Sequence, residues 1–332
     1  MFLDNQKIKI IAEIGVNHNG KISIAKKLIK EAKKAGADYV KFQIFQPSEI
    51  TTKLNKKTKY QKKFGKKNGT QLSMLKKYYL SYKNIRELNR FCRLNKIKFL
   101  ASAFDLTSLN FYNKLKPNLI KIPSGEITNK PLLKEISKLK INIIFSTGMS
   151  SIREIKEAYK ILKKTKKKVI PLYCISSYPT NLDEFDLKKM LNLKKINKQF
   201  GFSDHTTGNE ASLFAIANGA RVIEKHLTLS KKLSGPDHYA SMEPNNFRIL
   251  VKSIRNFEIL LKKETIKTKE ISNRRFVRKF LVATKLIKKG DIFSLENIGA
   301  KRSGGGISPM KIKNFLGIKS KRNYYPDQII KK

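Results

Sequence analysis

Two histidines follow neighbouring apolar runs, His205 at the end of FGFSDH and His226 within VIEKHLT. If both runs are parallel strands, their carboxyl ends meet at one edge and the two imidazoles can converge on one ion. Neutral imidazole is a common ligand of divalent transition metals. Two histidines without a third protein ligand also leave positions for water or substrate, as a catalytic metal requires. The pair therefore predicts a divalent metal site; the alternative is a pair of structural histidines.

Two lysines lie inside apolar runs, Lys41 in YVKFQI and Lys121 in LIKIPS. A buried cation needs a partner. Serines at three predicted strand ends favour an anionic ligand, a phosphate or a carboxylate, as that partner: Ser124, Ser146 and Ser203. The alternatives are a Lys–Glu pair inside the fold, with Glu13 or Glu126, and a lysine that forms a Schiff base.

Further polar side chains follow the remaining apolar runs. They include Glu13, Gln43, Glu126, Tyr178 and Glu224. Asp237 lies in GPDHYAS, where a carboxylate would suit the hydroxyl groups of a sugar, although Gly-Pro-Asp is also an ordinary turn. Polar residues gather wherever strands become loops, but that explains one or two such ends rather than eight together.

Alternating strand-like and helix-like segments position these residues. Short apolar runs are expected as strands at 8–15, 39–44, 98–104, 119–124, 143–148, 169–176, 200–205 and 222–228. Amphipathic segments are expected as helices at 23–36, 84–95, 106–115, 129–139, 151–164, within 183–194, 209–220 and 243–261. Eight βα units over roughly 250 residues predict a (β/α)8 or TIM barrel, an α/β fold whose site lies at the carboxyl ends of the strands. The alternative is an open doubly wound sheet, which would need fewer units.

The texture of the sequence changes after residue 262. Residues 1–262 carry the barrel pattern, whereas 263–276 are polar, lack apolar periodicity and are expected to be a linker. Residues 277–332 alternate short apolar runs with glycine and proline, which predicts a small, mainly β domain with a thin core. Within the barrel, the lysine-rich residues 53–73 are expected to form a long loop over the active face.

The 332 residues carry a formal net charge of +47, which alone suggests a nucleic-acid-binding protein. Only 12 of the 72 basic residues are arginine, the residue that base and phosphate readers favour. We interpret the widely spread lysines as solvated surface and expect no specific nucleic-acid partner. With two cysteines, no apolar run long enough to cross a bilayer and no secretory segment, we expect a cytoplasmic protein without membrane association or a disulfide framework.

A set of ordered motifs resembles the sialic acid synthase family, whose members are nonulosonate synthases. They are AEIGVNHNG (12–20), KFQ (41–43), KIPSGEITN (121–129), STGMSS (146–151), YPT (178–180), GFSDHTTG (201–208), VIEKHLTL (222–229) and GPDHYAS (235–241). The resemblance covers about residues 8–262. Beyond it, LIKKGD (286–291), AKRSGGG (300–306) and FLGIK (315–319) are similar to the family's antifreeze-like (SAF) domain.

The resemblance implies that phosphoenolpyruvate condenses with the open-chain aldehyde of an N-acylated amino sugar. Water enters and inorganic phosphate leaves by C–O cleavage, which gives a nine-carbon 2-keto acid. The expected sugar is N-acetylmannosamine, giving N-acetylneuraminate. The alternative is 2,4-diacetamido-2,4,6-trideoxymannose, giving N,N′-diacetyllegionaminate. By family analogy His205 and His226 bind Mn²⁺ or Mg²⁺, which polarises the aldehyde.

The resemblance also implies roles for the other site residues. Phosphoenolpyruvate would be held by Lys41, Lys121, Ser124, Ser146 and Ser203, and the sugar by Gln43, Tyr178 and Asp237. Glu13, Glu126 and Lys121 would take part in the chemistry, the two carboxylates as candidates for proton transfer or water activation. In the family the SAF domain crosses to a partner's barrel and offers an arginine to the sugar. Arg302 is the matching position, so the resemblance implies a domain-swapped homodimer.

Three residues beside these motifs depart from the family pattern. They are Ala103, Tyr173 and Ile175. None of them is a proposed ligand, and the expected consequence is an altered fit of the sugar.

Overall fold

The computed structural model describes residues 7–64, 69–261 and 268–331. By its internal contacts the chain divides into two compact units, Met1–Lys262 and Lys263–Lys332. The first unit holds a closed barrel and the second a small β domain.

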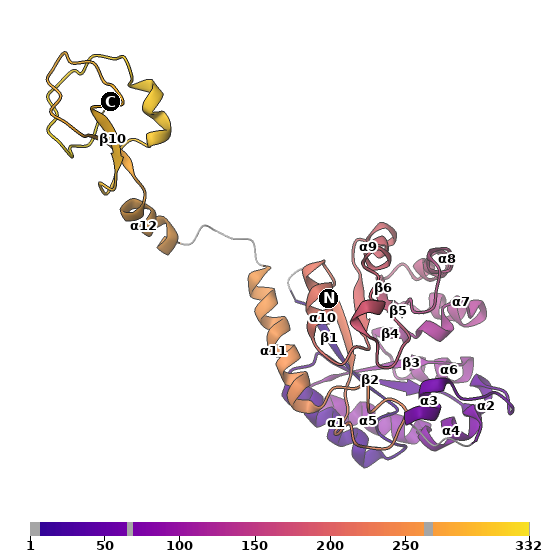
Figure 1. Cartoon of the computed structure of the whole chain (residues 1–332). Helices are drawn as coiled ribbons and strands as arrows, with labels where there is room; N and C mark the ends of the chain where they lie inside the picture. The colour runs from indigo at the N-terminus through magenta and orange to yellow at the C-terminus, as the bar shows by residue number, and fades with distance from the viewer. Residues whose placement is uncertain (1–6, 65–68, 262–267, 332) are drawn as a thin grey trace. The chain divides into compact units, whose positions relative to one another are not determined.

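The barrel consists of eight parallel strands in chain order, and the last pairs with the first (Figure 1). The strands are β1 (Lys9–Gly15), β2 (Tyr39–Ile44), β3 (Lys98–Ala103), β4 (Leu119–Ile122), β5 (Asn142–Ser146), β6 (Val169–Cys174), β7 (Gly201–Asp204) and β8 (Val222–His226). The predicted barrel is therefore confirmed. The open sheet is excluded because β1 and β8 pair along five residues from Lys9 to Glu13.

Helices follow the strands around the outside of the barrel (Figure 1). They are α1 (Ile22–Ala35), α5 (Tyr82–Leu94), α6 (Leu106–Lys114), α7 (Lys130–Lys138), α8 (Ile152–Leu162), α9 (Leu187–Ile196), α10 (Glu210–Ala217) and α11 (Pro244–Leu260). The connection from β2 to α5 adds α2 (Pro47–Ile50), α3 (Lys59–Phe64) and α4 (Gln71–Tyr78). The prediction of a long loop at 53–73 is thus wrong in part, because α3 and the start of α4 lie within it. These short helices have few apolar residues among many lysines, so the sequence shows no clear apolar period.

Helix α1 illustrates how the outer layer forms. Its buried residues recur at helical spacing: Ala25, Leu28, Ile29, Ala32 and Ala35. Gly36 ends the helix with a φ of 89°, a left-handed conformation that a β-carbon would strain. Helices α5 and α8 begin with capping boxes, in which Ser81 and Ser151 accept hydrogen bonds from backbone N–H groups of the first turn.

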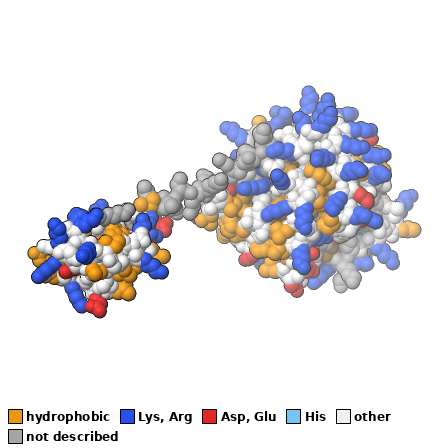
Figure 2. Space-filling view, turned by 90° about the horizontal axis from the view of Figure 1, so that it is seen from above, with side chains coloured by type: hydrophobic (Ala, Val, Ile, Leu, Met, Phe, Trp, Pro, Cys, Tyr) orange, Lys and Arg blue, Asp and Glu red, His pale blue; other side chains and the backbone are white. Residues whose placement is uncertain are grey.

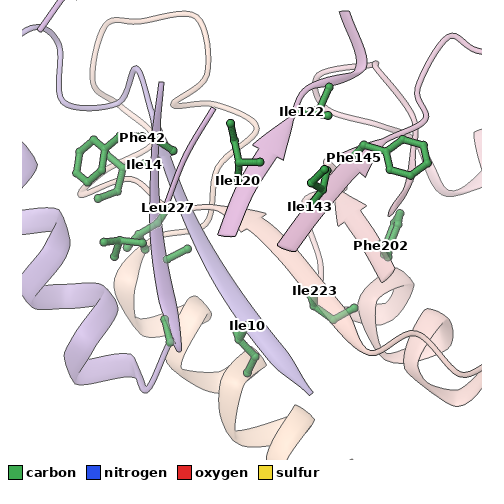
Figure 3. Close-up of a cluster of buried hydrophobic side chains, with 14 of the residues drawn as sticks. Ile10, Ile14, Phe42, Ile120, Ile122, Ile143, Phe145, Phe202, Ile223 and Leu227 are labelled. Atoms are coloured by element: carbon green, nitrogen blue, oxygen red, sulfur yellow. The ribbon is translucent and has the colours of Figure 1, made fainter. Parts of the chain in front are cut away.

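Each strand has an inner and an outer face. The inner apolar cluster consists of Ile11, Tyr39, Leu100, Leu119, Ile144, Ile170, Leu172 and Val222. The outer faces pack with the helices, and Figure 3 shows Ile10, Ile14, Phe42, Ile120 and Phe145 among them. Because strand side chains alternate with a period of two, the residue two positions after an inner apolar residue also faces inward. This alternation turns Glu13, Lys41, Lys121 and Ser146 into the barrel.

The second unit has its own small core. It contains α12 (Thr268–Val277), the antiparallel strands β9 (Phe280–Ala283) and β10 (Ile298–Lys301), and the 3-10 helix η4 (Pro309–Asn314). The core residues are Leu281, Ala283, Ile287, Phe293, Ile298, Phe315, Tyr324 and Ile330. The predicted small β domain is therefore confirmed.

Helix α12 overlaps the segment 263–276 that the sequence predicts to be a linker; residues 263–267 lie outside the described part of the chain. Residues 270–279 are exposed. A helix that buries no apolar face shows no apolar period, so only its helix-favouring composition could have predicted it.

Asp38 connects the barrel with α11. Its carboxylate accepts hydrogen bonds from the Ile10 backbone N–H at 3.0 Å and from the Arg255 guanidinium at 2.9 Å, and it lies 3.0 Å from Lys7 Nζ. Burial alone would raise the pKa of Asp38, but these partners outweigh burial and hold the pKa below its ordinary value.

We expect Asp38→Asn to lower the free energy of unfolding at pH 7 by about 1–3 kcal/mol, because charged partners lose their carboxylate. A depressed pKa contributes stability above the pKa of the unfolded state, and this contribution is lost as pH falls through the folded pKa. The difference between wild type and variant in urea unfolding should therefore shrink below about pH 4. The control is Glu135→Gln, which removes an exposed pair with Lys138 and should change little. An equal difference at pH 7 and at about pH 3 would contradict this reading.

Candidate active site

A cavity of about 390 Å³ lies at the carboxyl ends of the barrel strands. Its wall contains the predicted site residues Glu13, Lys41, Gln43, Lys121, Ser124, Ser146, Tyr178, Ser203, His205, His226 and Asp237. These side chains come from distant parts of the sequence and meet because the carboxyl ends of all eight strands share one face of the barrel.

Two predicted site residues are not part of this cavity wall. Glu126 ends the 3-10 turn η1 (Ser124–Glu126), and its carboxylate accepts a hydrogen bond from the Asn129 side chain at 2.7 Å. Arg302 belongs to the second unit, in which it is exposed. The single barrel therefore brings Glu13 to the cavity but not Glu126.

Two lysines and two carboxylates form a buried network on the cavity floor. Lys41 Nζ lies 3.2 Å from Glu13 Oε2 and 3.2 Å from Glu224 Oε2. Lys121 Nζ and Ser203 Oγ both donate to Glu224 Oε1, at 3.0 and 2.8 Å. The Lys–Glu pairing that the sequence left as an alternative is therefore present, with Glu224 as the shared carboxylate.

The two carboxylates of this network have opposite pKa shifts. Burial raises the pKa of Glu13 to about 7, although Lys41 opposes the shift. Burial would also raise the pKa of Glu224, but Lys121 and Lys41 outweigh it and hold the pKa well below its usual range. Glu224 is thus a permanent negative charge, whereas Glu13 can exchange a proton near neutral pH.

Several buried polar atoms around the floor have no hydrogen-bond partner among the described residues. Besides one oxygen each of Glu13 and Glu224, which lie within ion-pair distance of Lys41, they include the hydroxyls of Ser102 and Ser146, and Nδ1 of His226. Buried polar groups in proteins are nearly always paired, so unpaired ones in a cavity wall indicate where a ligand supplies the partner. Ser146 lines the same cavity as Lys41 and Lys121, which fits an anionic ligand.

The two predicted metal histidines lie together. Their ring centroids are 5.5 Å apart, and two imidazoles bound to one ion through bonds of about 2.1 Å have centroids within about 6.5 Å of each other. His205 Nδ1 donates to the Ile175 carbonyl at 2.6 Å, so the neutral form of the ring has its lone pair on Nε2. Burial, together with His205 and Lys41, lowers the pKa of His226 and favours the neutral imidazole that a metal needs.

The residues present fit a divalent ion, on the evidence of the unpaired His226 nitrogen and the oriented His205 ring. Within residues 7–64, 69–261 and 268–331, no group of three His, Cys, Asp or Glu side chains has the arrangement of a metal site. The pair would therefore be the protein's contribution to an open coordination shell.

A buried ion pair supports both histidines from behind. Lys225 Nζ lies 2.8 Å from Asp204 Oδ2 and donates to the carbonyls of Thr206 and Gly208 at 2.7 and 2.6 Å. Asp204 in turn accepts from the Ser212 hydroxyl at 2.6 Å. The ends of β7 and β8 are thereby tied together next to His205 and His226.

Aromatic and acidic side chains complete the cavity above the histidines. Tyr178 packs on His205 with ring centroids 4.2 Å apart, and Tyr60 from α3 stacks on Tyr178 at 4.9 Å. Asp237 is buried in the same wall, and burial raises its pKa to about 6. This part of the cavity offers rings and hydrogen-bond acceptors of the kind that bind a neutral polar molecule.

Comparison with known proteins identifies the family. The model of the NeuB family matches residues 28–266, and the SAF domain model matches residues 278–332. The chain belongs to the NeuB family. It is thus a phosphoenolpyruvate-dependent nonulosonate synthase, as the sequence motifs predicted, and enzymes of this family generally use a divalent metal.

Two relatives and one solved structure define the similarity. The chain is 44% identical to N,N′-diacetyllegionaminic acid synthase of Campylobacter jejuni subsp. jejuni serotype O:2, over 98% of this chain and 99% of that protein. It is 34% identical to human N-acetylneuraminate-9-phosphate synthase, over 93% and 88%. The crystal structure of N-acetylneuraminic acid (sialic acid) synthetase from Leptospira borgpetersenii serovar Hardjo-bovis in complex with citrate shares 32% identity, with a TM-score of 0.71 over 82% of this chain and 93% of that one.

Glu224 is the residue that the sequence prediction missed in this NeuB-family site. The sequence shows Glu224 only as one polar residue among the strand ends, although it lies two positions before His226 on the same strand face. The lysines that it pairs with come from β2 and β4, so only the closed barrel shows the contact.

The departures from the family pattern lie away from the cavity. Ala103 and Tyr173 face the outer layer, where the Tyr173 hydroxyl accepts a hydrogen bond from the Asp186 backbone N–H at 2.8 Å. Ile175 packs against the same layer, and its carbonyl receives the hydrogen bond from His205. None of these three side chains is in the cavity wall, so none is placed to contact the sugar directly.

In the view of Figure 2, the basic side chains of the barrel do not gather on one face. Lysine and arginine side chains are scattered over the visible surface of both units, with hydrophobic and uncharged atoms between them. No helix within the described ranges has both the length and the apolar composition needed to cross a membrane.

We expect His205→Ala and His226→Ala each to abolish metal retention and turnover together, because one imidazole cannot hold the ion in an open site. Manganese content after gel filtration and phosphate release from phosphoenolpyruvate would be measured in parallel. His238→Ala is a matched control: this buried histidine contacts Thr228 and Asn19 and is not part of the cavity wall. Normal manganese-dependent activity in either site variant would reject the assignment.

We expect Glu224→Gln to lower kcat/KM for phosphoenolpyruvate by at least about 100-fold, equivalent to about 2.7 kcal/mol, because Lys41 and Lys121 lose the carboxylate that orients them. Ser203→Ala removes one hydrogen bond to the same carboxylate and should cost about tenfold. Phosphate release at varied phosphoenolpyruvate checks both, with thermal unfolding to confirm the fold. A Glu224→Gln enzyme with unchanged kcat/KM would show that the network is dispensable.

Proposed function

We propose that this chain is an N,N′-diacetyllegionaminate synthase that condenses phosphoenolpyruvate with 2,4-diacetamido-2,4,6-trideoxymannose and water. The observation that carries the choice of sugar is the 44% identity over 98% of the chain to a relative of that name, against 34% for the human N-acetylneuraminate-9-phosphate synthase. N-acetylneuraminate synthesis, the first expectation from the sequence, becomes the second candidate, supported by the 32% identical sialic acid synthetase structure.

The anion end of the cavity suits phosphoenolpyruvate. We assign its phosphate and carboxylate to the residues Lys41, Lys121, Ser124, Ser146 and Ser203, all in the cavity wall. Two ammonium groups share the charge of Glu224, so an incoming anion meets net positive charge at the cavity floor. Serine hydroxyls orient the same anion, and the unpaired Ser146 hydroxyl supports this role.

The sugar is assigned to the region above the histidines. Gln43, Tyr178 and Asp237 would hold its hydroxyl and amide groups, and Arg302 from the SAF domain of a second copy would complete the subsite in a domain-swapped homodimer. A divalent ion, Mn²⁺ or Mg²⁺, held by His205 and His226 would supply Lewis-acid polarisation of the sugar aldehyde. The proposed cellular site is the cytoplasm.

The residues then have defined tasks in the reaction. C3 of phosphoenolpyruvate forms a bond with the aldehyde carbon, whose oxygen gains a proton; water adds at C2, and the C2–O bond to phosphate breaks. The lysines and serines orient the enol phosphate and stabilise the leaving phosphate. We assign proton exchange to Glu13, since a pKa of about 7 lets its carboxyl give and take a proton at neutral pH. Glu126 is a less suitable candidate because it is not in the cavity wall.

Product analysis tests the proposal. Purified protein with phosphoenolpyruvate and Mn²⁺ is given 2,4-diacetamido-2,4,6-trideoxymannose or N-acetylmannosamine, and phosphate release and product mass are recorded. We expect kcat/KM to be at least about tenfold higher for the diacetamido sugar, equivalent to about 1.4 kcal/mol of transition-state binding. A preference for N-acetylmannosamine would instead establish the sialic acid branch.

A further inference from the structure

One side of the cavity is formed by apolar side chains that have no part in the assignments above. Ile50 of α2 and Met74 and Leu75 of α4 are all half-buried and all in the cavity wall. Helices α2 and α4 contact each other and belong to the connection between β2 and α5. We call Ile50, Met74 and Leu75 the outer wall.

The outer wall is uncharged although its segment is strongly basic. Residues 53–77 include ten lysines, yet among the described residues of the segment none of them is in the cavity wall. In α4, Met74 and Leu75 face the cavity, while the following Lys76 and Lys77 are exposed to solvent. The cationic groups of the cavity are Lys41 and Lys121, which come from the strands. The β2–α5 connection also brings Thr58, Gln61 and Gln71 to the cavity wall. The cavity therefore has a charged floor and an uncharged side, of which the outer wall is the apolar part.

This division matches one class of sugar. The diacetamido sugar of the proposed function has its aldehyde at one end and, at C6 and on the C4 acetamido group, two methyl groups towards the other. N-acetylmannosamine has hydroxyls at both positions, and a 6-phosphorylated sugar carries two negative charges there. An apolar wall gains from burying methyl groups and leaves hydroxyl or phosphate oxygens without partners.

We propose that the outer wall is the subsite for the C6 and C4-acetamido methyl groups and decides between the 6-deoxy diacetamido sugar and its hydroxylated analogue. This inference rests on the proposed function. A methyl-sized difference in an apolar pocket changes kcat/KM by about 10- to 200-fold. These side chains therefore act on the choice of sugar and leave the binding of phosphoenolpyruvate unchanged.

The test compares the two sugars in outer-wall variants. Met74→Gln and Leu75→Asn keep side-chain size and introduce a polar group at the wall. We expect each to lower, by about tenfold or more, the ratio of kcat/KM for the diacetamido sugar to that for N-acetylmannosamine. The KM for phosphoenolpyruvate should stay within about twofold of wild type, because the floor is untouched.

Matched variants keep the result interpretable. Leu72→Asn makes the same change on α4 at a half-buried residue that is not in the cavity wall, and it should leave the ratio unchanged. Met74→Leu keeps the apolar character and should also keep the wild-type ratio. Met74→Leu serves as the folded reference. If Met74→Gln or Leu75→Asn is unstable, Ile50→Thr replaces the unstable variant.

The wild-type ratio and the changes in the variants answer different questions. If wild type prefers N-acetylmannosamine, the proposed function is rejected, whatever the variants do. If wild type prefers the diacetamido sugar but the polar variants leave the ratio within about twofold, the outer wall is not the discriminating subsite and the proposed function stands. A change in Leu72→Asn as large as in Leu75→Asn would also overturn the inference.

Discussion

Charge compensation inside the barrel is the constraint on which the site depends. Lys41 and Lys121 are almost fully buried, and Glu224 lies within 3.2 Å of the first and 3.0 Å of the second. One carboxylate cannot neutralise two ammonium groups, and with a pKa of about 7 Glu13 supplies only part of a second charge at neutral pH. The floor therefore keeps positive charge for an anion while its lysines are already oriented, which is the preorganisation that phosphoryl-group binding requires.

Strand alternation explains how much of this arrangement the sequence predicted. Inward-facing Lys41 and Lys121 follow from their places two residues after Tyr39 and Leu119 in apolar runs, and the convergence of His205 and His226 follows from the barrel. The sequence did not predict which carboxylate pairs with both lysines, because Glu13, Glu126 and Glu224 all lie at strand ends. Only the closed barrel, which brings β2, β4 and β8 together, shows that it is Glu224. Helix α12 was missed for a different reason: an exposed helix leaves no apolar period in the sequence.

The choice of sugar was harder to predict because its determinants lie outside the strand pattern. The motifs that resemble the family contain the floor residues and the histidines, to which our proposal assigns the part of the reaction common to nonulosonate synthases. The variable end of the sugar faces the β2–α5 connection in our proposal, and there the sequence shows mainly lysines. Only the side-chain positions separate Met74 and Leu75, which face the cavity, from Lys76 and Lys77, which face solvent.

The same alternation brings the two histidines to one face of the sheet. Asp204 and Lys225 are register partners on β7 and β8 and face outward, so their immediate neighbours His205 and His226 face inward. Lys225 also holds the carbonyls of Thr206 and Gly208, which fixes the backbone just after His205. The separation of the two imidazoles is thus set by a buried ion pair on the opposite face of the sheet. An ion that binds between them meets ligands already in place, and the free energy of binding is not spent on ordering the chain.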